Sequence, residues 1–142
     1  MENSKFHRGR LIDHVHIVVR DLGSAKRFYT ALFEVLGIPL GGEGPGFFWS
    51  DELFVSTADS PAARGEMTGR VHLAFQAKDR AMVERFHTET LRAGGKDNGP
   101  PGERPYHPGY YAAFALDPDG NNIEVVFHGP AKRSASSVEI TF

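Results

Sequence analysis

The chain has 142 residues, 40% hydrophobic and 24% charged, which is typical of one globular domain with room for a core. A formal net charge of −2 at pH 7 argues against a nucleic-acid or anionic-membrane partner, so we expect a small-molecule substrate. The absence of cysteine excludes disulfides and thiolate chemistry. The sequence has no apolar leader and no long apolar run, so we predict no membrane span and a cytoplasmic protein.

An internal repeat organises the predicted elements, because residues 10–38 superpose on residues 68–96. The matched pairs are His14 with His72, Asp21 with Asp79, Phe28 with Phe86 and Gly37 with Gly95. Each copy has an apolar strand, an Asp that caps a helix, apolar positions three and four apart, and a Gly that ends the helix. Each half of the chain therefore begins as strand then helix.

Both predicted helices have one apolar face for packing on a sheet. The core-facing residues of the first are Ala25, Phe28, Tyr29, Leu32 and Leu36. Those of the second are Val83, Phe86, His87 and Leu91.

Short strands are predicted after each helix, in residues 46–58 and again in 109–129, where Asp-Pro-Asp-Gly at 117–120 indicates a hairpin turn. A polar connector, 59–69, joins the halves. Residues 97–109 are too rich in Pro and Gly to predict regular structure. That loop carries Arg104, Tyr106 and His107, and either shapes the mouth of a pocket or simply crosses the surface.

The C-terminal tail alternates apolar residues at its end, as Val138, Ile140 and Phe142. This alternation is compatible with an extra strand, and a position at the chain terminus is equally compatible with fraying.

Four side chains of metal-ligand type fall on predicted strands: His14, His16, His72 and Glu124. Residues two apart on a strand share a face, so His14 and His16 lie on one side of the strand that begins near Leu11. Glu124 lies on the polar side of the last strand. Two imidazoles and one carboxylate from three strands can form a facial triad around a divalent ion. Taken singly, each residue is more often structural, but His14 and His72 occupy equivalent places in the repeat, which favours a shared site.

The motifs that carry a family resemblance are "DHVHIVVRDL…FYTALF", "GRVHLAF" and "LDPDGNNIEVV". They resemble the vicinal oxygen chelate superfamily, the group of glyoxalase I, fosfomycin- and bleomycin-resistance proteins and extradiol dioxygenases, over roughly residues 11–127. The resemblance implies an α+β fold of two βαβββ modules that form a cup-shaped mixed β-sheet with flanking helices. It implies one glyoxalase-like domain, 11–129, with module one at about 11–58, module two at about 70–129 and a tail at 130–142. It also implies a homodimer.

Carried over by position, the resemblance assigns the metal ligands as His14, His72 and Glu124, for Fe, Mn, Ni or Zn. Glyoxalase I has a further glutamate, which is also its base, in the strand that corresponds here to "ELFVSTA"; this strand offers only Glu52, at its start. The gap argues against an ordinary methylglyoxal–glutathione isomerase, because proton transfer needs a base within reach of the substrate. His16 and Tyr110 are the candidate catalytic residues, although a hydrogen-bonding role for His16 and a packing role for Tyr110 stay open.

The leading hypothesis is a metal-dependent enzyme of lyase, isomerase or dioxygenase type that chelates two neighbouring oxygens of a small substrate. The alternative is a non-catalytic binding or resistance protein of the bleomycin-resistance type. Fosfomycin resistance is disfavoured, because the sequence shows no Lys or Arg cluster around the ligands. A third hypothesis, a protein whose function is its dimer interface, has the least support because it gives no reason for the three ligand-type residues.

Overall fold

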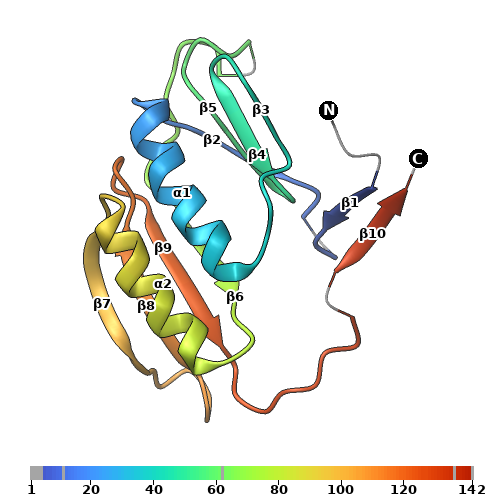
Figure 1. The fold of residues 1–142 in the computed structure, drawn as a ribbon, viewed down its shortest axis with the longest axis vertical. Helices are drawn as coiled ribbons and strands as arrows, with labels where there is room; N and C mark the ends of the chain where they lie inside the picture. Colours follow the sequence, from blue (N-terminus) through green and yellow to red (C-terminus); the bar gives the residue numbers. More distant parts are fainter. Residues whose placement is uncertain (1–4, 11, 62, 136, 142) are drawn as a thin grey trace. The chain divides into compact units, whose positions relative to one another are not determined.

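The computed structural model describes residues 5–10, 12–61, 63–135 and 137–141. These residues form two helices, two four-stranded sheets and one two-stranded sheet (Figure 1). They group into two compact units, which we describe separately. The first unit contains β1–β5 and β10, and the second contains α1, α2 and β6–β9. No helix among these residues is long and apolar enough to cross a membrane.

The main sheet of the first unit contains four short strands in the order β2-β5-β4-β3. Their bounds are β2 Val15–Val18, β3 Gly42–Gly44, β4 Phe47–Ser50 and β5 Leu53–Ser56. β2 runs parallel to β5, and the other neighbours are antiparallel. Ile17, Phe48 and Val55 are fully buried, as expected from the alternating apolar pattern. The predicted start of the first strand at Leu11 lies outside the described residues.

The first unit also contains a ribbon formed by the two ends of the chain (Figure 1). β1, Lys5–Arg8, pairs antiparallel with β10, Val138–Thr141. The alternating tail therefore forms an extra strand, although Phe142 lies outside the described residues. β1 was not predicted, because "KFHR" is short and mostly polar and has no local strand pattern.

The second unit repeats the strand topology of the first, in the order β6-β9-β8-β7. Its elements are α1 Leu22–Leu36, β6 His72–Gln76, α2 Arg80–Arg92, β7 Lys96–Glu103, β8 Tyr111–Leu116 and β9 Asn122–Phe127. β6 runs parallel to β9, and the remaining pairs are antiparallel. The predicted α+β class and the two βαβββ modules are thus confirmed.

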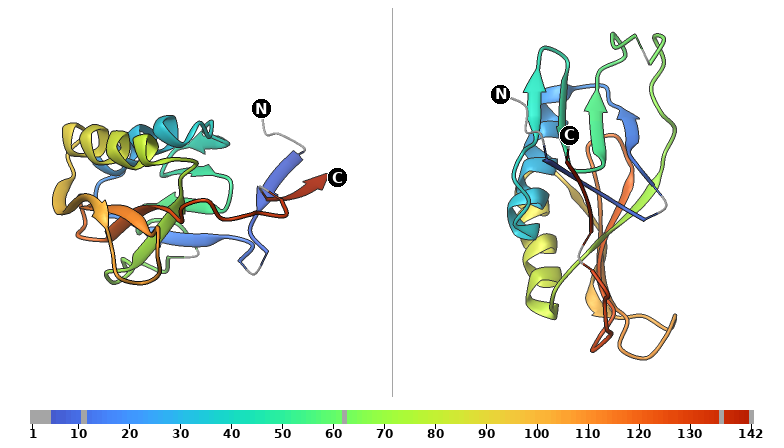
Figure 2. Two further views of the ribbon diagram at one scale, coloured as in Figure 1. Left: turned by 90° about the horizontal axis from the view of Figure 1, so that it is seen from below. Right: turned by 90° about the vertical axis from the view of Figure 1, so that its right-hand side faces the viewer.

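Both helices lie on the same face of the second sheet (Figure 2). All five predicted core residues of α1 are buried, and Phe33 and Val35 are buried with them. In α2 the predicted Val83 and Phe86 are buried, but the predicted His87 and Leu91 are only half-buried, and Thr90 is buried in addition. The Thr90 hydroxyl is accommodated there because it donates to the Phe86 carbonyl (2.6 Å).

The helices begin and end with the predicted types of capping residue, but one glycine differs by one position. Asp79 caps α2, since its side chain accepts the Met82 N–H (2.8 Å), and Gly37 follows α1 with a φ of +72°. After α2 the left-handed residue is Gly94, at +102°, rather than the predicted Gly95. Gly95 serves packing instead, because a Cβ there would lie 2.6 Å from Cε2 of Phe28.

Removal of the α2 cap is expected to have a measurable but moderate effect. Asp79→Ala leaves the Met82 N–H without its side-chain acceptor, so we expect unfolding free energy to fall by about 1 kcal/mol. Urea denaturation followed by circular dichroism measures this loss. Asp79→Asn, which keeps an acceptor oxygen, is the matched control, and an equal loss in both variants would contradict the capping role.

The segment 97–109 was predicted to lack regular structure, and this prediction is wrong for its first half, where β7 reaches Glu103. β7 is at the edge of the sheet, next to β8, and its register shifts between Asp97 and Gly99 and again between Gly99 and Gly102. An edge strand tolerates proline where no ladder partner needs its N–H, and bulges absorb the irregular spacing. Pro100 and Pro101 lie within the second shift.

The predicted turn at 117–120 joins β8 to β9 and is organised by the buried carboxylate of Asp117. Its Oδ1 accepts the backbone N–H of Asp119 (2.9 Å) and of Asn121 (2.8 Å). Its Oδ2 accepts the Asn121 side-chain amide (2.7 Å) and the Tyr29 hydroxyl of α1 (2.5 Å). Asn121 in turn accepts the Val71 N–H (2.9 Å), so one turn connects α1, β8, β9 and the entry to β6.

Candidate functional site

The register of the second sheet places Glu124 in the middle of β9, opposite Ala74 of β6 and Phe114 of β8. Although it is a carboxylate on the face away from the helices, Glu124 is only 2% exposed. Burial of a charge this deep is costly unless the charge is paired or binds a metal. The position of Glu124 therefore calls for partners that compensate the lost hydration.

Two side chains provide those partners. Nε2 of His72 lies 2.9 Å from Oε1 of Glu124, and the Tyr110 hydroxyl donates to Oε2. The His72 side chain is itself half exposed, at 53%, and its ring is 6.0 Å from that of Phe114. We call His72, Tyr110 and Glu124 the Glu124 cluster. It joins two predicted metal ligands and one predicted catalytic residue.

The electrostatics of this cluster keep the Tyr110 phenol protonated. Burial, together with the hydrogen bond to Glu124 and the negative charge of that residue, raises the pKa of Tyr110 to about 12. The positive charge of Arg104 opposes this rise. Tyr110 is consequently a hydrogen-bond donor at neutral pH and not a base.

The third predicted ligand, His14, belongs to the first unit, directly before β2. Its Nδ1 lies 2.6 Å from Oδ1 of Asp13, and the His14 side chain is 61% exposed. An imidazole whose Nδ1 contacts a carboxylate presents Nε2 as the free ligand atom. His14 also lines a cavity of about 250 Å³ in this unit, together with Arg8, Trp49, Asp51 and Phe54.

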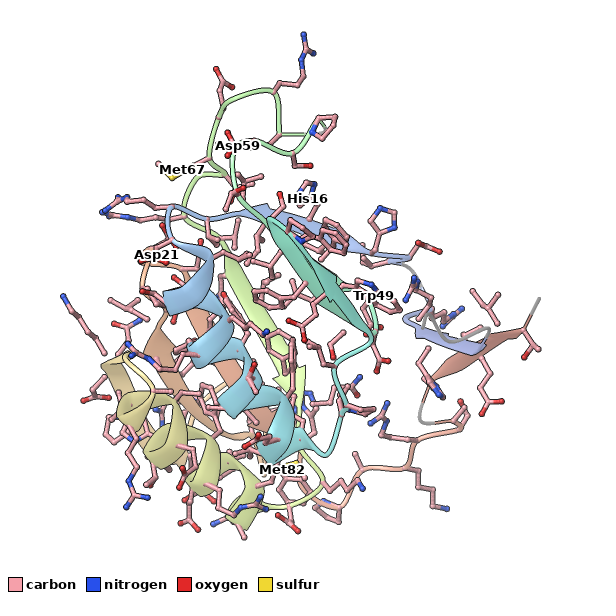
Figure 3. All side chains as sticks on the ribbon, turned by 45° about the horizontal axis from the view of Figure 1, so that its top comes forward. His16, Asp21, Trp49, Asp59, Met67 and Met82 are labelled. Atoms are coloured by element: carbon pink, nitrogen blue, oxygen red, sulfur yellow. The ribbon has the colours of Figure 1, made fainter. Side chains whose placement is uncertain are left out.

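His16, the other candidate catalytic residue, is on β2 of the first unit, as is visible in Figure 3, where Trp49 of β4 is also labelled. Its Nε2 contacts the buried Ser56 hydroxyl (2.7 Å), and its ring meets Phe54 edge to face. Burial and the nearby His14 lower the pKa of His16. The hydrogen-bonding role is therefore realised in the structure.

The repeat shows what replaces the glutamate that glyoxalase I has in its first module. Phe54 of β5 is opposite His16 of β2, and Glu124 of β9 is opposite Ala74 of β6, so Phe54 occupies the position in the first sheet that Glu124 occupies in the second. The Phe54 ring stacks on Phe47 (5.5 Å between ring centres). Glu52 precedes β5 and is half-buried, and burial raises the pKa of its carboxyl group. The strand body thus holds an aromatic ring where a carboxylate would be required.

The donors present fit a divalent ion in part. An imidazole nitrogen and a buried carboxylate oxygen, 2.9 Å apart, are first-row metal ligands that occupy neighbouring coordination positions. No group of three or more His, Cys, Asp or Glu side chains that could hold a metal occurs within the described ranges. Since His14 belongs to the other unit, the set of three ligands stays a prediction.

Some residues around these sites were not foreseen. Arg8 reaches the His14 cavity from β1, an element without a sequence signal. His128, which was also not foreseen, is hydrogen-bonded to His107 of the loop named above (2.9 Å), and both rings pack against Tyr110. Arg104 and Tyr110 are opposite each other just beyond β7 and β8, and this pairing was not predicted because the sequence of β7 was interpreted as a loop.

Comparisons with known proteins agree with this fold. The curated protein YqjT of Bacillus subtilis (strain 168) is 30% identical over 126 residues, which cover 80% of this chain and 95% of that protein. A glyoxalase/bleomycin resistance protein from Albidiferax ferrireducens T118 is 31% identical with a TM-score of 0.63, over 82% of this chain and 97% of that one. A lactoylglutathione lyase from Agrobacterium tumefaciens is 21% identical with a TM-score of 0.59, over 82% and 92%, which shows the shared fold alone.

A family model matches residues 11–125, nearly the whole span over which the sequence motifs, the repeated βαβββ topology and the Glu124 cluster occur. The chain belongs to the Glyoxalase/Bleomycin resistance protein/Dioxygenase superfamily.

Proposed function

We propose that the protein is a metal-dependent enzyme of the glyoxalase type, of lyase, isomerase or dioxygenase class, in which His14, His72 and Glu124 hold a divalent Fe, Mn, Ni or Zn ion. The observation that carries this proposal is the Glu124 carboxylate, which is 2% exposed and 2.9 Å from His72 Nε2. When bound, the ion supplies Lewis-acid polarisation of two neighbouring substrate oxygens and stabilises negative charge that develops on them.

The residues of the chain have separable roles in this proposal. His72 and Glu124 bring one nitrogen and one oxygen within 2.9 Å of each other on the face of the second sheet away from the helices. Tyr110 donates to the second carboxylate oxygen and thereby fixes the orientation of the Glu124 carboxylate. Because its phenol stays protonated at neutral pH, Tyr110 keeps its single O–H donated to Glu124, and its oxygen can still accept a hydrogen bond from a substrate hydroxyl.

An isomerase of the methylglyoxal–glutathione type is the least favoured member of this class. Phe54 occupies the position at which the first module would need a carboxylate base. His16 is a neutral imidazole close to Ser56 and is the candidate acid–base residue of the first unit.

The alternative function is a small-molecule binding or resistance protein without turnover. The observation in its favour is the cavity of about 250 Å³ in the first unit, whose walls include Trp49 and Phe54. Aromatic walls hold a flat ligand without any metal. This alternative predicts that binding survives loss of the metal ligands.

Native mass spectrometry of the purified protein tests the proposal, because it counts both the bound ions and the chains in each particle. We expect about one divalent ion per chain in a homodimer, and loss of the ion in a His14→Ala/Glu124→Ala double variant that keeps its circular dichroism. If no metal is bound after addition of Fe, Mn, Ni and Zn in turn, the metal-dependent enzyme is refuted and the binding protein without turnover is favoured.

A further inference from the structure

The guanidinium of Arg104 lies beside the Glu124 cluster in the second unit and has no role in the proposed metal site. Arg104 directly follows β7, and its backbone N–H donates to the carbonyl of Tyr110 (2.9 Å), which directly precedes β8. The two residues therefore face each other across the open end of the β7–β8 hairpin. Residues directly opposite in an antiparallel pair share one face of the sheet.

The identity of that face follows from the preceding pair, Glu103 and Tyr111. The Tyr111 hydroxyl donates to Glu84 of α2 (3.1 Å), and Arg80 of α2 forms an ion pair with Glu103 (2.9 Å). Glu103 and Tyr111 thus point to the helices. Because successive residues alternate between the faces, Arg104 and Tyr110 point to the opposite face.

The surface of β7 is shaped to receive the guanidinium. A Cβ on Gly102 would lie 3.0 Å from Nη1 of Arg104, and one on Gly99 would lie 3.3 Å from Nη2. The guanidinium carbon is 5.3 Å from the centre of the Phe114 ring, and Phe114 is directly opposite Glu124 in the register. Two residues without side chains and one aromatic ring therefore support Arg104 on the same face as Glu124.

This arrangement leaves hydrogen-bonding capacity for a ligand. Nη2 donates to the Pro100 carbonyl (2.7 Å) and Nη1 to the Glu103 carbonyl (3.3 Å). A guanidinium has five N–H donors, and no carboxylate within the described ranges forms an ion pair with Arg104. A held guanidinium with free donors and uncompensated charge matches a planar carboxylate.

We propose that Arg104 binds a carboxylate group of the substrate, so that the substrate class is a small compound with two neighbouring oxygens and a separate carboxylate. This inference rests on the proposed function for the two oxygens, and on Arg104 alone for the carboxylate. One guanidinium suits a singly charged group, whereas a phosphonate or phosphate would call for further cations on this face.

The probes are 3,4-dihydroxybenzoate and 3,4-dihydroxybenzamide, which share the two neighbouring oxygens and the shape and differ in charge. Calorimetric titration of the Ni²⁺-loaded wild type is expected to show roughly tenfold or greater preference for the benzoate. Arg104→Gln is expected to abolish this preference and leave the benzamide affinity unchanged. Arg92→Gln, which removes an exposed arginine of α2, is the matched control and should keep the preference.

A second measurement does not depend on the metal. The ¹⁵N–¹H resonance of the Arg104 side-chain Nε, assigned by its loss in Arg104→Lys, is followed in metal-free protein as each probe is added. We expect a saturable shift with the benzoate and none with the benzamide.

The outcomes separate this inference from the proposed function. Ni²⁺ binding with equal affinity for both probes in wild type and Arg104→Gln, and no Nε shift, would overturn the role of Arg104 and leave the metal site standing. A shift of the Nε resonance in a protein that binds no divalent ion would support Arg104 and refute the metal site.

Discussion

Replacing Asp117 by alanine is expected to lower the unfolding free energy of the second unit by roughly 3–5 kcal/mol. The Asp117 carboxylate is 4% exposed and accepts four hydrogen bonds, from Tyr29, Asp119 and both nitrogens of Asn121. Alanine leaves these donors without an acceptor inside the protein, where an unsatisfied polar group costs about 1–3 kcal/mol. Urea denaturation followed by helical circular dichroism measures the loss, because both helices belong to this unit.

Tyr29→Phe is the companion variant, since it removes one of the four donors and keeps the ring. We expect a loss of about 1–2 kcal/mol near neutral pH. Burial and the charge of Asp117 raise the pKa of Tyr29 well above its usual value. Above about pH 10 the unfolded chain ionises Tyr29 while the folded protein does not, so the wild type loses stability there and the phenylalanine variant is spared this loss.

The stability difference between wild type and Tyr29→Phe should therefore narrow between about pH 8 and about pH 11. A constant difference across this range would contradict the buried, protonated Tyr29.

For Asp117→Ala, a loss of unfolding free energy below about 1 kcal/mol would show that the turn is not organised by the Asp117 carboxylate. The fluorescence of Trp49, which lies in the first unit, reports that unit in the same samples.

Glu124→Gln is expected to remove the stabilisation that the wild type gains from a divalent ion. An ion at about 100 times its dissociation constant stabilises the folded protein by about 2.7 kcal/mol if it binds only the folded state. Glutamine keeps an acceptor for the Tyr110 hydroxyl but lacks the negative charge that a metal ligand provides. Thermal unfolding with and without added Ni²⁺ or Zn²⁺ should show an upward shift in the wild type alone.

Glu103→Gln is the control for this measurement, because Glu103 is exposed and its ion pair with Arg80 faces α2. This control should retain the full metal-dependent shift. Equal shifts in Glu124→Gln and wild type would exclude Glu124 as a ligand. Without metal, Glu124→Gln should change stability little, since the hydrogen bond from Tyr110 is preserved.

The fold was predictable from the sequence where local patterns and tertiary packing agree. The apolar face of α1, the cap at Asp79 and the turn at 117–120 each have a physical signature within a few residues. The strands that were missed, β1, β3 and β7, have no such signature. β1 depends on pairing with a segment at the other end of the chain, and β7 contains prolines that a central strand would not tolerate.

The residue types at the candidate site were predictable from the sequence, but the contacts between those residues were predictable only in part. Alternation along β9 places Glu124 on the face away from the helices, and the repeat indicates His72. The contact of Tyr110 with Glu124 depends on the register between β8 and β9, which short strands do not specify by themselves. The support of Arg104 by Gly102 depends in the same way on the bulged pairing of β7.

The irregular edge strand β7 also has a consequence for solubility during folding. An exposed strand edge offers a row of N–H and C=O groups to which another chain can add, and such additions lead to aggregation. Pro100 and Pro101 have no N–H to offer and lie within the second shift of register, between Gly99 and Gly102, while the first shift interrupts the ladder between Asp97 and Gly99. The proline-rich sequence of β7 therefore protects this edge of the sheet from extension by a second polypeptide.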